Sequence, residues 1–156
     1  MLVRFTKGKH KTYSLTCVRD NGSSTWSTYP SSSNFAQHDL VHFAVETTLG
    51  YRDAFYGLLA GGRDIPSFGE RDQTTGKSPT VPLQAAQTEF IVSLLQAELY
   101  DQEINEDFMA TLALACGNLD VPVITAEQLD QIRRRIKVVL KQWADLPPGE
   151  FLEFTF

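Results

Sequence analysis

The chain opens with Leu2-Val-Arg-Phe-Thr-Lys7, Thr12-Tyr-Ser-Leu-Thr-Cys-Val-Arg19 and Ser24-Thr-Trp-Ser-Thr-Tyr29, three short segments rich in β-branched and aromatic residues. This composition favours strands. Lys-Gly-Lys-His at 7–10 and Asp-Asn-Gly at 20–22 separate the segments, and their glycine and asparagine residues suit tight hairpin turns. The sequence therefore predicts an antiparallel meander over residues 2–29.

Helical periodicity dominates the residues that follow. A polar break at 30–34 precedes a predicted helix over 34–49, in which Asn34 and Gln37 have the spacing of a capping pair. The next helix is expected from Pro82, with its apolar face at Leu83, Ala86, Phe90, Leu94 and Leu95. Other helices are expected over 51–60, after a cap at Asn105, and after a capping pair at Thr125 and Gln128.

The last segment, Phe151–Phe156, alternates apolar and polar residues and predicts a strand that returns to the N-terminal sheet. No internal repeat is visible, and the only shift in composition is a polar loop at 63–82, long enough to serve as a lid. We therefore predict a single α+β domain over residues 1–156. It would have a small antiparallel sheet of about four strands, covered on one face by about five helices.

Composition and charge limit the functions open to the chain. A net charge of -5 over 156 residues argues against a nucleic-acid-binding surface, which usually carries a clustered positive field. Cys17 and Cys116 lack ligand spacing and suit a reduced, cytoplasmic protein. Arg4 interrupts the first apolar residues, so no signal peptide is expected, and no apolar stretch is long enough to span a bilayer. Assembly into a homo-oligomer stays open.

The groups best suited to bind a metal or move a proton gather in His38-Asp-Leu-Val-His-Phe-Ala-Val-Glu46. On a helix, His38 and His42 lie one turn apart, at the edge of an apolar side formed by Leu40, Val41, Ala44 and Val45. Both imidazoles can converge on one divalent metal ion, with zinc expected first. Glu46 lies about 12 Å from His38 along the helix axis, too far to share that ion, and is expected to support His42 instead.

The third ligand and the general base are less defined. Asp64, His10 and the residues of the polar loop are alternative third ligands that the sequence does not rank. Asp39 or Glu46 would act as the base. The five residues from 38 to 42, HDxxH, resemble the HExxH motif of zinc metalloproteases with Asp39 in place of glutamate. The shorter carboxylate would need a shifted helix or metal to reach a metal-bound water.

A wider block of sequence carries a second resemblance. His38–Glu46, Thr48-Leu-Gly50, Phe55-Tyr-Gly-Leu-Leu59 and Gly62-Arg-Asp64 resemble a group of small uncharacterised bacterial proteins with an HDLxHxxVExxLG…FxGL…GxD segment. This resemblance covers residues 38–64. It implies a cytoplasmic bacterial domain and adds Asp64 to the candidate site, but it implies no activity.

Two functions from different classes remain open. The first is a metal-assisted hydrolase in which His38 and His42 are the ligands, Asp39 or Glu46 is the base, and the loop at 63–82 is a lid. The second is a non-enzymatic binding or assembly module in which the histidine and glutamate side chains form a structural hydrogen-bonded network. The sequence alone does not decide whether the protein is an enzyme.

Overall fold

The computed structural model describes residues 1–30, 34–69, 80–100 and 107–156. In these ranges, four strands form an antiparallel sheet in the order β3-β2-β1-β4: β1 (Leu2–Lys7), β2 (Thr12–Val18), β3 (Ser24–Pro30) and β4 (Phe151–Thr155). The helices are α1 (Phe35–Leu49), α2 (Phe55–Ala60), α3 (Leu83–Tyr100), α4 (Phe108–Cys116) and α5 (Ala126–Asp145), with a short 3₁₀ helix, η1 (Ile65–Gly69). The α+β class and the antiparallel sheet predicted from the sequence are confirmed.

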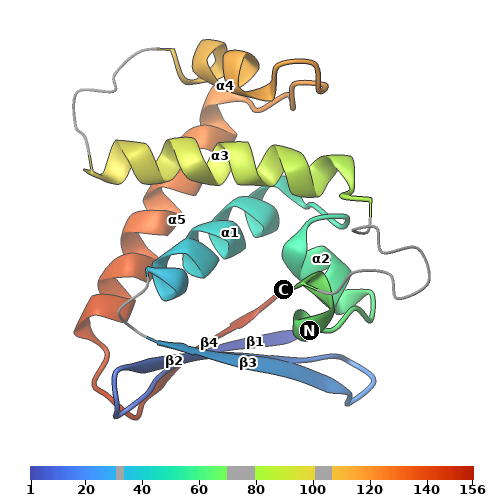
Figure 1. The fold of residues 1–156 in the computed structure, drawn as a ribbon. Coiled ribbons are helices and arrows are strands. Elements are labelled where there is room, and N and C mark those ends of the chain that lie inside the picture. Colours follow the sequence, from blue (N-terminus) through green and yellow to red (C-terminus); the bar gives the residue numbers. More distant parts are fainter. Residues whose placement is uncertain (31–33, 70–79, 101–106) are drawn as a thin grey trace.

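The labelled helices lie on one side of the sheet (Figure 1). The register explains which strand residues face them, because Val3 on β1 lies opposite Cys17 on β2 and Phe154 on β4. Val3 and Cys17 are fully buried, whereas Arg4, the next residue on β1, is exposed on the opposite face. The predicted return of the last strand to the N-terminal sheet is confirmed, with β4 paired beside β1.

Helix α1 lies between the sheet and helix α3 (Figure 1). Leu40 and Phe43 belong to a hydrophobic cluster shared with the sheet, whereas Val41 and Val45 belong to a second cluster shared with α3, α4 and α5. The four residues of the predicted apolar side, Leu40, Val41, Ala44 and Val45, are buried as expected, but Phe43 outside that side is buried as well. Because α1 is enclosed from both directions, even Glu46 is fully buried.

The ends of the helices follow the sequence in some places and not in others. The capping box of α5 is confirmed, since the Gln128 backbone N–H donates to Thr125 Oγ1 at 3.1 Å. Helix α1 begins at Phe35, but Asn34 makes no side-chain cap, so the predicted capping pair is wrong there. Helix α2 begins at Phe55 rather than at 51, and the backbone N–H groups of residues 52 and 53, which precede it, donate to the Gln84 side chain.

Helix α3 is rotated relative to the prediction. Its buried residues are Gln87, Thr88, Ile91, Val92 and Leu95, whereas Leu83 is 43% exposed. Two of these buried residues are polar and have partners, because Gln87 donates to the Asp120 carbonyl and Thr88 donates to the Gln84 carbonyl. A rule that buries only apolar side chains therefore selects the wrong face.

The remaining predictions concern the loops. Helix α4 begins at Phe108 with Asp107 as its cap, and the predicted cap at Asn105 lies outside the described residues. The first part of the polar loop forms η1, in which Ile65 is buried, while residues 70–79 of the predicted lid also lie outside the described ranges. Within those ranges, no helix combines the length and apolar character needed to cross a bilayer.

Candidate metal centre

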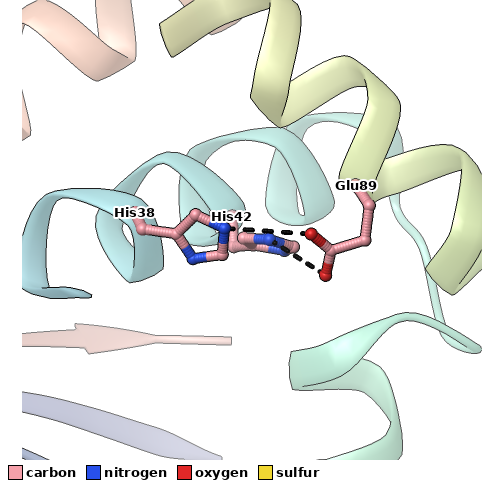
Figure 2. Close-up of side chains that lie close together, drawn as sticks. All are labelled: His38, His42 and Glu89. Carbon is pink, nitrogen blue, oxygen red and sulfur yellow. Dashed lines mark ion pairs between the residues drawn. The ribbon is translucent and has the colours of Figure 1, made fainter. Parts of the chain in front are cut away.

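Two histidines of α1 face one carboxylate of α3. The rings of His38 and His42 lie one helical turn apart with their centroids separated by 4.5 Å. Figure 2 shows both rings beside Glu89, which reaches across from α3. Nε2 of His42 lies 3.5 Å from Glu89 Oε1, and Nε2 of His38 lies 3.8 Å from Glu89 Oε2. Each carboxylate oxygen thus faces one imidazole.

This group could hold a metal ion. Among the residues that the structure describes, His38, His42 and Glu89 each offer a ligand atom, and these atoms lie within 4.8 Å of one another. A tetrahedral zinc ion with bonds of about 2.0–2.1 Å would separate its ligand atoms by about 3.3 Å. The contacts of 3.5 and 3.8 Å to Glu89 are close to that separation. Small side-chain movements would therefore close the group around an ion.

His42 is held as metal-binding histidines usually are. Its side chain is buried, and its Nδ1 lies 3.4 Å from Glu46 Oε1. Its Nε2 is buried and has no hydrogen-bond partner among the described residues. A carboxylate on one ring nitrogen fixes the tautomer and leaves the other nitrogen as the ligand atom. Burial disfavours the charged ring, but Glu46 and Glu89 outweigh it and raise the pKa of His42 to about 9.

His38 has a similar arrangement behind it. Its Nδ1 lies 3.5 Å from Asp39 Oδ1, while the other oxygen of Asp39 accepts a hydrogen bond of 2.9 Å from the Tyr13 hydroxyl. Tyr56 donates its hydroxyl to the Asp39 carbonyl at 2.9 Å. The Asp39 side chain is therefore tied to β2 through Tyr13, and the two histidines each have a carboxylate at Nδ1 and Glu89 at Nε2.

Glu46 connects the centre to helix α2. Its Oε2 accepts hydrogen bonds from the backbone N–H groups of Tyr56 at 2.8 Å and Gly57 at 3.4 Å. The cap residue of α2 is Ala54, whose side chain cannot accept a hydrogen bond, so Glu46 supplies the acceptor from α1. Burial raises the pKa of Glu46, and the His42 side chain opposes that shift. These three donors hold the carboxylate that orients His42.

A cavity of about 260 Å³ opens beside the two histidines. Its lining consists of Tyr29, Phe35, His38, Asp39, His42, Phe55, Phe68 and Glu89. The side chain of His42 is only 3% exposed, whereas that of Glu89 is 61% exposed. The centre is thus enclosed on the α1 side and open beside α3, which leaves room for water or a small ligand next to the potential ligand atoms.

The structure separates the other residues proposed from the sequence. Asp64 follows α2 in the sequence and forms an ion pair of 2.8 Å with Arg19. It is not part of the group of described residues that could hold a metal. His10 lies exposed in the turn between β1 and β2. Asp39 and Glu46 contact the histidines from behind, as described above. The structure thus brings together His38, His42, Asp39 and Glu46, but neither Asp64 nor His10, and residues 70–79 of the polar loop lie outside the described ranges.

Glu89 is the residue that sequence reasoning missed. It lies in a different helix from the histidines and has no spacing relation to them, so no local motif includes it. The only signal is its place on α3 beside Thr88 and Val92, two residues that face the core. Recognising it requires knowing that α3 crosses α1 at this point.

Comparisons of the chain with models of protein families, with curated proteins and with solved structures find no match. The resemblance of residues 38–64 to a group of small bacterial proteins therefore stays a prediction. The chemistry of the centre is argued from its own geometry.

Proposed function

We propose that the protein binds one zinc ion through Nε2 of His38, Nε2 of His42 and the carboxylate of Glu89, and uses it to hydrolyse a carbonyl substrate. The observation that carries this proposal is the convergence of His38, His42 and Glu89, whose potential ligand atoms lie within 4.8 Å of one another, with the buried Nε2 of His42 facing Glu89 Oε1 at 3.5 Å and making no hydrogen bond among the described residues. A buried polar atom without a partner costs free energy. A bond to a metal ion would remove that cost.

The donor atoms support zinc over the other common metals. Two imidazole nitrogens and one carboxylate oxygen form a ligand set that zinc favours, whereas magnesium and calcium prefer oxygen ligands alone. Three protein ligands leave a fourth position for water, and zinc lowers the pKa of that water to about 7. The cavity beside Glu89 provides space for this water and for a substrate.

Hydrolysis at such a centre follows a simple sequence of steps. A zinc ion held by His38, His42 and Glu89 would supply an activated water for attack on the carbonyl carbon of an ester or amide, and Asp39, which lines the cavity, would accept a proton from that water. As the carbon–oxygen or carbon–nitrogen bond breaks, Asp39 would return this proton to the leaving group. The products are a carboxylic acid and an alcohol or amine. Glu46 is a positioning residue, because it is fully buried behind His42 and does not line the cavity.

Zinc titration of the untagged protein tests the proposal. After treatment with a chelator, the chain should take up one zinc ion in competition with a chromophoric chelator. Glu89→Gln should weaken that binding at least about 100-fold, because removing a ligand costs more than removing a supporting partner. Glu98→Gln is the matched control, since Glu98 lies on the same helix but pairs with Arg133. It should bind zinc like the wild type.

A second matched pair uses the histidines. The chain has 3 of them, and His38→Ala should remove zinc binding while His10→Ala leaves it intact. Zinc-loaded protein should also hydrolyse 4-nitrophenyl acetate faster than the metal-free protein or Glu89→Gln. A chain that stays metal-free with zinc, manganese or nickel added would overturn the proposal, as would unchanged zinc affinity in Glu89→Gln.

One observation favours the alternative function, a non-enzymatic module with a structural histidine and glutamate network. Glu46 joins α1 to α2 through hydrogen bonds from Tyr56 and Gly57, and this role needs no metal. In that case His42→Ala would lower the free energy of unfolding by about 1–3 kcal/mol whether or not zinc is added. Under the zinc proposal the loss is larger with zinc present than with zinc removed.

A further inference from the structure

We infer that the cavity beside the metal centre selects an uncharged substrate that carries one aromatic ring next to its carbonyl group. This inference rests on the proposed zinc site, which supplies the point where the carbonyl group binds. It adds the class of substrate, which the ligand atoms alone do not define. The walls, the size and the charge of the cavity each contribute to it.

Aromatic side chains form the walls. Tyr29 and Phe35 lie with their ring centroids 5.0 Å apart, and Phe55 and Phe68 form a second pair at 5.0 Å. All four rings line the same cavity as His38 and His42. Aromatic rings prefer edge-to-face or offset contacts with another ring at such separations. A substrate ring can therefore pack against either pair.

These four rings are more exposed to solvent than the aromatic rings of the neighbouring core. Phe35 is 47% exposed, and Tyr29, Phe55 and Phe68 are only partly buried. By contrast, Phe5 and Tyr56 in the neighbouring core are fully buried. Accessible aromatic rings that line a concave surface are typical of ligand sites. A bound ring would cover the apolar surface that these side chains leave open.

The size of the cavity limits the substrate. Its volume is about 260 Å³, and a cavity of roughly 150 Å³ is enough to hold benzene. The remaining space suits a carbonyl group and a small leaving group. One aromatic ring beside the reacting carbonyl is therefore the best match.

The charges around the cavity disfavour an anionic ring. Apart from the two histidines at the proposed metal, the charged residues that line it are Asp39 and Glu89, and no lysine or arginine among the described residues does so. Arg63 stacks on Phe68 at 4.1 Å from the ring centroid but is not part of the lining. A carboxylate on the substrate ring would be buried beside aromatic walls without a counter-ion, which is costly.

Hydroxamic acids test the inference, because the hydroxamate group binds the metal and the attached group probes the cavity. The protein is loaded with cobalt in place of zinc, and the visible absorption bands of cobalt report each addition. Benzohydroxamic acid should bind at least about tenfold more tightly than acetohydroxamic acid, because its ring buries apolar surface. The para-carboxylate of benzohydroxamic acid should lose at least that tenfold gain.

The outcomes separate this inference from the zinc proposal. If acetohydroxamic acid changes the cobalt spectrum but the added ring gives no gain, the aromatic substrate class is wrong and the metal site stands. If the para-carboxylate or a para-trimethylammonium derivative binds more tightly than benzohydroxamic acid itself, the preference for an uncharged ring is wrong. If neither simple hydroxamate changes the spectrum, the open metal position is wrong and both proposals fail.

A pair of variants locates the binding surface. Phe35→Ala should remove most of the benzohydroxamic acid gain and leave acetohydroxamic acid binding unchanged. Phe151→Ala is the matched control, because Phe151 is 46% exposed on β4 and is not part of the cavity lining. It should keep the full gain. Equal losses in the two variants would overturn the inference.

Discussion

Helices α1 and α5 pack into the same fold but bury different kinds of side chain. Helix α5 is amphipathic, and its buried residues are Leu129, Ile132, Ile136, Val139 and Trp143. Helix α1 is enclosed by the sheet and by α3, and it buries His42 and Glu46 together with its apolar residues. A helix with a solvent face can turn its polar groups outward. A helix enclosed on opposite sides must give them partners instead.

The buried polar groups of α1 differ in how far their hydrogen bonding is satisfied. Glu46 accepts hydrogen bonds from His42 and from two backbone N–H groups of α2. Nε2 of His42 faces Glu89 but makes no hydrogen bond among the described residues. Buried ionisable groups are weak contributors to stability compared with apolar residues of similar size. Under the proposed function, a bound metal ion would account for their presence at the centre of α1.

The largest expected effect comes from removing the buried carboxylate of α1. Glu46→Ala should lower the free energy of unfolding by about 3–5 kcal/mol, because it leaves His42 and the N–H groups of α2 without an acceptor. Urea unfolding in the presence of a chelator measures this without a metal contribution. The control variant on α5 is Asp130→Ala. The Asp130 side chain is 62% exposed, so this variant should keep the urea midpoint of the wild type. Equal midpoints for the two variants would contradict the contrast between the helices.

Zinc should stabilise the protein through α1 and α3. At a free zinc concentration 100 times the dissociation constant, binding to the native state adds about 2.7 kcal/mol to the free energy of unfolding. For a chain of 156 residues, this raises the melting temperature by about 5–10 °C. Calorimetry with and without zinc measures the shift. His38→Ala should abolish it and His10→Ala should retain it, and a shift that survives in His38→Ala would place the zinc elsewhere.

The carboxylates at 39 and 64 provide the next comparison. Asp39 lies 3.5 Å from His38 Nδ1, so Asp39→Asn should weaken zinc binding about 10–100-fold, as loss of a partner behind a ligand usually does. Asp64 pairs with Arg19 instead, and Asp64→Asn should leave zinc affinity within about threefold of the wild type. Chelator competition measures both. A loss in Asp64→Asn would restore Asp64 as a candidate ligand.

The parts of the fold that were predictable are those where local pattern and environment agree. The meander, the capping box of α5 and the existence of strand β4 follow from short-range sequence features, and β4 returns to the N-terminal sheet as predicted, where it pairs with β1. The predicted apolar residues of α1 are buried, but Phe43 on its other side was missed, and the buried face of α3 was predicted wrongly. Those faces depend on which elements surround each helix, and α3 buries Gln87 and Thr88 through hydrogen bonds that a hydrophobic pattern does not register.

The centre was predictable only where its residues share one helix. The four-residue step predicts that His38 and His42 are neighbours, and their ring centroids lie 4.5 Å apart. Glu89 comes from α3, so its approach depends on how two helices cross rather than on spacing within one. The contact of Asp39 with Tyr13 likewise joins α1 to β2. Long-range packing, which a single sequence does not display, supplies these residues.

The smallest expected effect compares the N-terminal ends of the two helices. Thr125 Oγ1 accepts from the Gln128 N–H at the start of α5, whereas Asn34 offers α1 no side-chain hydrogen bond. Thr125→Ala should therefore lower the free energy of unfolding by about 1 kcal/mol, and Asn34→Ala should change it by less than about 0.3 kcal/mol. Urea unfolding of both variants under the same conditions measures the difference. An equal loss at Asn34 would mean that α1 depends on a local cap as α5 does, rather than on its enclosure by the sheet and α3.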